Sequence, residues 1–110
     1  MVKDLPDAVA GYLKADRERD SDALLGWFTR DAEVTDEDRA YRGHAEIRRW
    51  REGAAAAYEY SVAVLGSEPV GTDGHVVRTR LEGNFPGGTV DLTYRFTLRD
   101  GLIAGLEIAP

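Results

Sequence analysis

Tyr12 and Asp36 are the residues of this sequence whose types and spacing point most directly to chemistry. Tyr12 falls within the first amphipathic segment, and Asp36 comes 24 residues later, at the end of a short predicted strand. A phenol can donate a hydrogen bond, and a carboxylate can take up and release a proton. If the fold brings both into one apolar pocket, they are suited to move a proton beside a carbonyl group.

Two helices are expected before Asp36. The first runs from about Pro6 to Arg19, because proline fits a first helical turn and apolar residues recur at helical spacing on one side. Tyr12 lies on that side. The second is short, with Ser21 expected as its cap and an apolar stripe that ends with Trp27 and Phe28.

A small hairpin and a third helix are expected next. Residues 32–35 and 40–42 favour two short strands around the acidic turn at 36–39. The helix follows Gly43, and its spacing turns Ile47, Trp50, Ala54 and Ala57 toward a core. The same spacing leaves four residues in solvent: Arg48, Arg49, Arg51 and Glu52.

From Tyr58 onward the apolar residues alternate with polar ones, which is typical of strands with one buried face. Turn signals at 71–74, 86–88 and 100–101 separate the strands and predict hairpins. In the last strand, Leu102, Ala104, Leu106 and Ile108 are expected on the apolar face. Residues 1–110 therefore predict a single α+β domain, with three N-terminal helices packed on the concave face of a curved, mostly antiparallel sheet.

Composition excludes several classes of partner and site. The net charge of −6 opposes binding to phosphate backbones, so nucleic acid is not an expected partner. No stretch reaches the roughly 20 apolar residues of a membrane span, and a cytoplasmic location is expected. With no cysteine, and with His44 and His75 expected at the surface without acidic partners, no metal site is predicted.

The order of these signals resembles the NTF2-like superfamily, and within it the SnoaL-like polyketide cyclase and ketosteroid isomerase branch. The resemblance rests on residues 12–16, 27–34, 41–47 and 94–103. It implies a cone-shaped fold without a cofactor, in which Tyr12 stabilises a developing oxyanion and Asp36 shuttles the proton. Leu92 takes the place of a second oxyanion donor, so steroid isomerisation at full rate is not expected.

A second resemblance, to limonene-epoxide hydrolases, is rejected. Their Arg-x-Asp strand motif is similar to Arg80-Leu81-Glu82, but alternation puts both charged residues on the polar face, and the remaining acid would fall at Ile108.

The expected ligand is a small, largely apolar organic molecule with a carbonyl group. Tyr12 and Asp36 are the predicted catalytic pair, and Asp38 is an alternative to Asp36. Two other interpretations stay open: the acidic turn lies in solvent without a catalytic role, or Tyr12 is an ordinary core residue. A non-catalytic ligand-binding or dimerisation module is the alternative function, and a homodimer through the charged sheet face is expected. The predicted pocket wall comprises Trp27, Phe28, Trp50, Tyr60, Leu92, Tyr94, Leu106 and Ile108.

Overall fold

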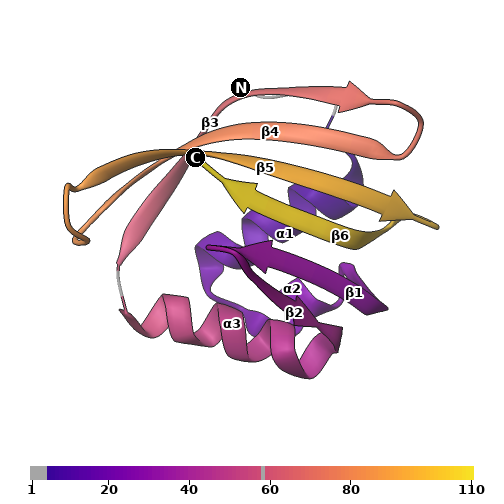
Figure 1. Cartoon of the computed structure of the whole chain (residues 1–110), viewed down its shortest axis with the longest axis horizontal. Helices are drawn as coiled ribbons and strands as arrows, with labels where there is room; N and C mark the ends of the chain where they lie inside the picture. The colour runs from indigo at the N-terminus through magenta and orange to yellow at the C-terminus, as the bar shows by residue number, and fades with distance from the viewer. Residues whose placement is uncertain (1–4, 58) are drawn as a thin grey trace.

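The computed structural model describes residues 5–57 and 59–110, without the side chains of residues 54–57. Three helices and six strands make up this part of the chain (Figure 1). The helices are α1 (Asp7–Glu18), α2 (Ser21–Leu25) and α3 (Gly43–Ala57). The strands are β1 (Phe28–Asp36), β2 (Arg39–Arg42), β3 (Tyr60–Val70), β4 (Gly74–Gly83), β5 (Thr89–Arg99) and β6 (Leu102–Ala109).

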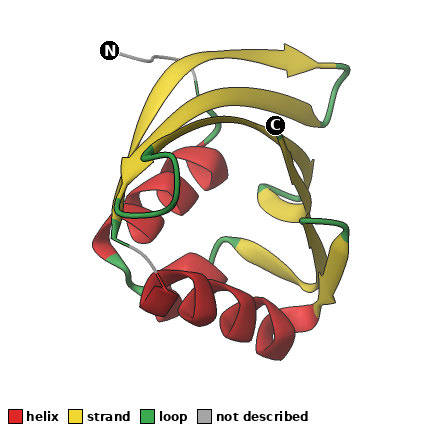
Figure 2. Ribbon diagram, turned by 60° about the vertical axis from the view of Figure 1, so that its left-hand side comes forward, coloured by secondary structure: helices red, strands yellow, loops and turns green. Residues whose placement is uncertain are grey.

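The six strands form one sheet in the order β2-β1-β6-β5-β4-β3. All neighbouring pairs are antiparallel except β1 and β6, which run parallel. Figure 2 shows the sheet curling over the helices, so that its concave face and the helices enclose the core. The predicted α+β cone, with helices packed on a curved and mostly antiparallel sheet, is confirmed. None of the described helices combines the length and apolar character needed to cross a membrane.

The core is built from one face of each element. Tyr12 of α1, Ile47 of α3 and Phe96 of β5 are almost completely buried. Alternation on β4 buries Val77, Thr79 and Leu81 while Arg78, Arg80 and Glu82 stay exposed. This is the pattern expected of a sheet that packs on helices with one face only.

The second helix is shorter than predicted. Asp20, rather than Ser21, is its N-cap and accepts a hydrogen bond from the Ala23 backbone N–H at 3.1 Å. Phe28 is not part of the helix but begins β1, beside Ile103 of β6. The Ile103 N–H donates to the Trp27 carbonyl at 2.7 Å, so pairing with β6 ends the helix.

Three predicted exposures are wrong. Arg51 is buried rather than solvated, because it follows Ile47 by four residues and lies on the same helix face. His75 is buried, because β4 begins at Gly74 and places this ring on the same face as Val77. In β6, Ile103 is buried and Leu102 only half-buried, because a register irregularity between β5 and β6 changes the phase.

Two expectations of the third helix and the following strand concern residues outside the described part. Ala54 and Ala57 were expected to face the core, and their side chains are not described. Tyr58 was expected to begin a strand and also lies outside the described residues, whereas the strand itself begins at Tyr60.

Candidate functional site

Tyr12 lies at the centre of the core. Its ring contacts Phe28, Tyr94 and Phe96 in edge-on geometry, with centroid separations of 5.8, 6.3 and 5.6 Å. The side chain is fully buried, and its hydroxyl has no hydrogen-bond partner among the described residues. Burial, followed by the nearby Asp16 carboxylate, raises the pKa of the phenol well above its usual value. Tyr12 therefore remains a neutral, unused hydrogen-bond donor.

Asp36 points to the same side of the sheet as Tyr94. It pairs with Ile108 of β6, which in turn pairs with Tyr94 of β5, and directly paired residues share one face of a sheet. Asp36 is half-buried, and its Oδ2 atom accepts a hydrogen bond from Trp50 Nε1 at 3.0 Å. The carboxylate is therefore oriented by the indole of α3.

The neighbouring acids form the turn that ends β1. Glu37 and Asp38 are exposed and both have positive φ, at 53° and 63°. Two successive positive φ values are typical of the tight turns that join antiparallel strands. Asp36, not Asp38, is thus the carboxylate on the concave side.

The other predicted wall residues occupy several places. Phe28, Trp50, Tyr94, Leu106 and Ile108 are buried members of the core, and Leu92 packs against it. The Trp27 indole lies on the α1 backbone, since a Cβ added to Gly11 would come within 2.0 Å of that ring. Asp36 and Tyr94 thus lie on one face of the sheet, and Trp50 of α3 bonds to Asp36 there. Tyr12 of α1 contacts Tyr94 on the same face.

A buried polar cluster completes this interior, and it was not predicted from the sequence. Asp16 lies one helical turn after Tyr12, and its Oδ1 atom contacts Arg51 Nη1 at 3.1 Å, with both side chains at least nine-tenths buried. Arg51 Nη2 also donates to the Tyr60 hydroxyl. The guanidinium lies over the Trp50 ring, 4.8 Å from its centroid. The spacing of the sequence could have indicated this burial. Asp16 lies four positions after the core residue Tyr12, and Arg51 lies four positions after the core residue Ile47, so each shares a helix face with it.

The pKa values of this cluster reflect burial and proximity. Burial raises the pKa of the Asp16 carboxyl, and the Arg51 and Arg19 charges only partly oppose this. Burial disfavours the charge on Arg51, but the surrounding acidic groups, Tyr12 and Asp16 foremost, outweigh it and raise the pKa of the guanidinium. Burial also raises the pKa of Tyr60. The cluster thus combines the Arg51 cation, the Asp16 carboxyl held against it at 3.1 Å and the protonated phenol of Tyr60.

A cavity of about 160 Å³ adjoins this cluster. Asp16, Arg51 and Tyr60 all line it, together with residues of α2 and the start of β3. Tyr60 is the predicted wall residue that this cavity contacts. Tyr12 and Asp36 are not among its lining residues. Tyr12 lies one helical turn before the lining residue Asp16 on α1, and its unpaired hydroxyl is buried in the core.

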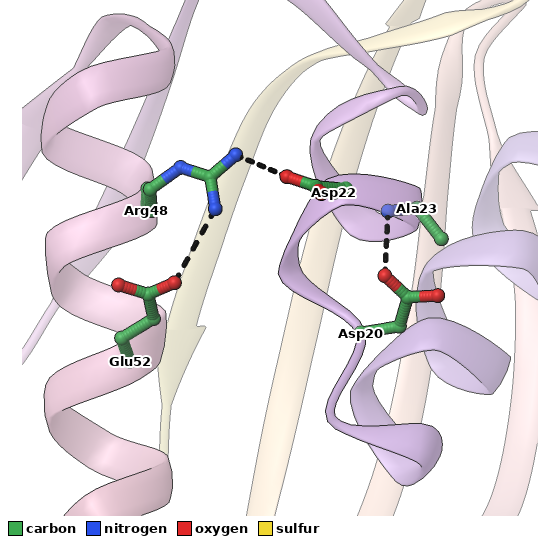
Figure 3. A network of polar contacts seen from close by, with 5 residues as sticks. All are labelled: Asp20, Asp22, Ala23, Arg48 and Glu52. Atoms are coloured by element: carbon green, nitrogen blue, oxygen red, sulfur yellow. Dashed lines mark hydrogen bonds and ion pairs between the residues drawn. The ribbon is translucent and has the colours of Figure 1, made fainter.

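The outer rim of this region is fixed by ion pairs between helices. Figure 3 shows Arg48 of α3 reaching Asp22 of α2, at 2.5 Å, and Glu52 of its own helix, at 3.3 Å. These groups are exposed, so each pair adds little stability. The pair of Arg48 and Asp22 links α3 to α2 next to the cavity.

Comparisons with known proteins agree with this architecture. The sequence model of the family described as SnoaL-like domain matches residues 9–106. No curated protein matches the chain. Protein SMa1630 from Sinorhizobium meliloti, provisionally named a polyketide cyclase, has a solved structure that is 45% identical with a TM-score of 0.91; the match covers 96% of this chain and 95% of that one.

More distant structures share the fold. A protein from Catenulispora acidiphila with a ketosteroid isomerase-like fold, solved with trimethylamine, is 18% identical with a TM-score of 0.86, covering 97% of this chain and 87% of that one. Protein RV0760c from Mycobacterium tuberculosis, solved with estradiol-17beta-hemisuccinate, is 15% identical with a TM-score of 0.80, covering 94% and 90%. At these identities the likeness concerns the fold.

Proposed function

Because the chain belongs to the SnoaL-like domain family of the NTF2-like superfamily, we propose that it binds a small, largely apolar carbonyl compound inside its cone and moves a proton on it without a cofactor. Asp36 acts as the base and Tyr12 as the donor to the oxyanion. Isomerisation and aldol-type cyclisation are the reactions that fit these two roles.

The observation that carries the proposal is the unpaired hydroxyl of Tyr12. A buried donor without a partner costs about 1–3 kcal/mol, and such groups in native proteins call for an explanation. A ligand carbonyl that reaches this hydroxyl would satisfy it. The raised pKa supports the role, because only a protonated phenol can donate.

Asp36, at the end of β1, supports the same chemistry. Its Oδ2 atom is held by Trp50, and the carboxylate lies on the concave face in the row that contains Tyr94. A carboxylate fixed through one oxygen can present the other to a substrate. Proton transfer by a positioned carboxylate contributes about 10²–10⁴ in rate.

The test is exchange of the acidic α-hydrogens of simple ketones for deuterium, followed by NMR. Asp36→Asn should abolish enzyme-catalysed exchange, and Tyr12→Phe should lower it by about 10²–10³, the usual cost of one oxyanion donor. Asp38→Asn is the matched control, because this exposed turn residue lies two positions away, and it should exchange at the wild-type rate. If Asp36→Asn equals wild type on every ketone tried, the catalytic proposal fails.

A non-catalytic binding module is the second candidate, and one observation favours it. Aromatic rings surround Tyr12, and the Trp50 N–H already occupies one oxygen of the half-buried Asp36. A core filled in this way needs side chains to move before a ligand reaches either group. Ligand binding with no exchange on any substrate would favour this function.

We also propose a homodimer through the convex sheet face and a cytoplasmic location. On that face Arg80 pairs with Asp91 through two contacts of 2.8 and 3.1 Å, and Arg78 pairs with Glu68 at 3.0 Å. Rows of opposite charge can complement themselves across a two-fold axis. Light scattering at high protein concentration in low salt should give the dimer mass, and a monomer would rule the interface out. Cell fractionation tests the location.

A further inference from the structure

We infer that the cavity beside Asp16, Arg51 and Tyr60 is a polar subsite for the ligand, and that it takes an uncharged group carrying a hydroxyl next to a carbonyl. The inference rests on the proposed function, because it names the polar end of the ligand that the cone would bind.

The volume of the cavity sets the size of the group. About 160 Å³ corresponds to roughly five water molecules at about 30 Å³ each. Pockets that enclose an entire drug-sized ligand have about 300–1,000 Å³. The cavity therefore holds one end of a molecule, and the remainder must extend beyond it.

The charges of the buried cluster determine the polarity of the group. Arg51 is neutralised by Asp16 at 3.1 Å and also donates to Tyr60. A bound carboxylate would compete with Asp16 for the same cation, and a bound ammonium would compete with Arg51 for the same carboxylate. The exposed charged residues at the rim are two cations, Arg17 and Arg19, and one anion, Asp20, and water screens them. The buried pair of Asp16 and Arg51 is neutral as a whole, and it therefore favours an uncharged ligand.

The remaining hydrogen-bonding capacity defines the chemistry. An ionised carboxylate accepts hydrogen bonds at both of its oxygens, so Asp16 can accept one from a ligand while Oδ1 holds Arg51. Tyr60 accepts from Arg51 and keeps its own O–H for donation. Burial keeps this phenol protonated by raising its pKa. One acceptor beside one donor matches a ligand hydroxyl beside a ligand carbonyl.

Three probes of one shape test the match. Phenacyl alcohol carries both groups, acetophenone lacks the hydroxyl, and 2-phenylethanol lacks the carbonyl. Binding is followed by NMR on the ¹⁵N-labelled full chain. Phenacyl alcohol should bind about 10–100-fold more tightly than acetophenone, from a hydrogen bond to a charged group, and about 3–10-fold more tightly than 2-phenylethanol, from a neutral one. The Ser61 amide, beside the cavity, should shift, and that of Val70 at the far end of β3 should not.

Tyr60→Phe removes the donor with little change in shape. It should abolish the preference for phenacyl alcohol over 2-phenylethanol while keeping most of the preference over acetophenone. Tyr41→Phe is the matched control, because Tyr41 is also half-buried and packs on Trp50, at 6.1 Å between ring centroids, but does not line the cavity. Both preferences should remain in that variant.

Three outcomes would overturn the inference. Phenylacetate binding more tightly than phenacyl alcohol would show an anion site. Unchanged preferences in Tyr60→Phe would show that this donor is not used, and no binding of phenacyl alcohol up to its solubility would show that the cavity is not a subsite. None of these outcomes depends on turnover. The deuterium exchange of Asp36→Asn tests the proposed reaction separately: loss of exchange supports that reaction, and exchange at the wild-type rate refutes it.

Discussion

The buried ion pair of Asp16 and Arg51 gives a prediction with a definite size. Replacing Arg51 by Met keeps much of the side-chain volume over Trp50 but leaves the Asp16 carboxylate, only 4% exposed, without its cation. Replacing both residues, Asp16→Leu with Arg51→Met, removes the two charges together. The single change creates an uncompensated buried charge, and the double change does not.

The expected magnitudes follow from this difference. Breaking a buried pair from one side costs about 3–5 kcal/mol, whereas replacing the whole pair with apolar residues of similar size is often neutral or stabilising by about 1–4 kcal/mol. Arg51→Met should therefore lose about 3–5 kcal/mol of unfolding free energy at pH 7. The double variant should be at least about as stable as wild type.

The pH dependence of the single variant has a fixed sign. The pKa of Asp16 is already raised by burial against the opposing charges of Arg51 and Arg19, and without Arg51 it rises further. A carboxyl whose folded pKa exceeds its unfolded value binds protons more tightly in the folded state, so stability falls as pH rises through the folded pKa. Arg51→Met should thus regain stability as the pH is lowered from 7 toward the usual pKa of a carboxyl, and the double variant should not show this gain.

Urea unfolding followed by tryptophan fluorescence measures all three proteins. At typical slopes of about 1–3 kcal/mol per M, the single variant should lose more than about 1 M in its midpoint. A single variant that is unfolded without urea also meets the expectation, provided that the double variant folds. A loss below about 1 kcal/mol in Arg51→Met, or equal losses in the single and double variants, would refute the reasoning.

Two further changes test the surroundings of the site. Gly11→Ala should destabilise the protein by about 1–2 kcal/mol, because the added Cβ meets the Trp27 ring at 2.0 Å and overpacking outweighs the gain of about 1 kcal/mol in helix propensity. Thermal unfolding measures this loss. In a Trp27→Ala background, where the ring is absent, the same change should raise the stability instead. Trp50→Phe should lower the free energy of unfolding by about 1–3 kcal/mol, because it leaves Asp36 without its indole donor. Urea unfolding measures the loss. In an Asp36→Asn background, which has no carboxylate to leave unpaired, the same change should cost less.

The sequence by itself determined the fold. Helical spacing in α1 and α3, alternation along β3, β4 and β5, and turn residues such as Gly87 and Gly88, both with positive φ, are local signals that the structure repeats. They are readable because backbone geometry imposes a period of 3.6 or 2 on which side chains are buried. The order of these signals also led to the family. It placed Asp36 at the end of a strand, where the structure has it.

Local signals failed wherever burial depended on a distant partner. Arg51 reads as one member of an arginine run, and only its contacts with Asp16 of α1 and Tyr60 of β3 make it a core residue. His75 and Ile103 were misread because strand ends and register irregularities are set by pairing between strands. The position of the cavity was likewise decided by tertiary packing, because aromatic rings of β1 and β5 fill the space around Tyr12 of α1. The open volume lies one helical turn further along α1, where Asp16, α3 and β3 meet.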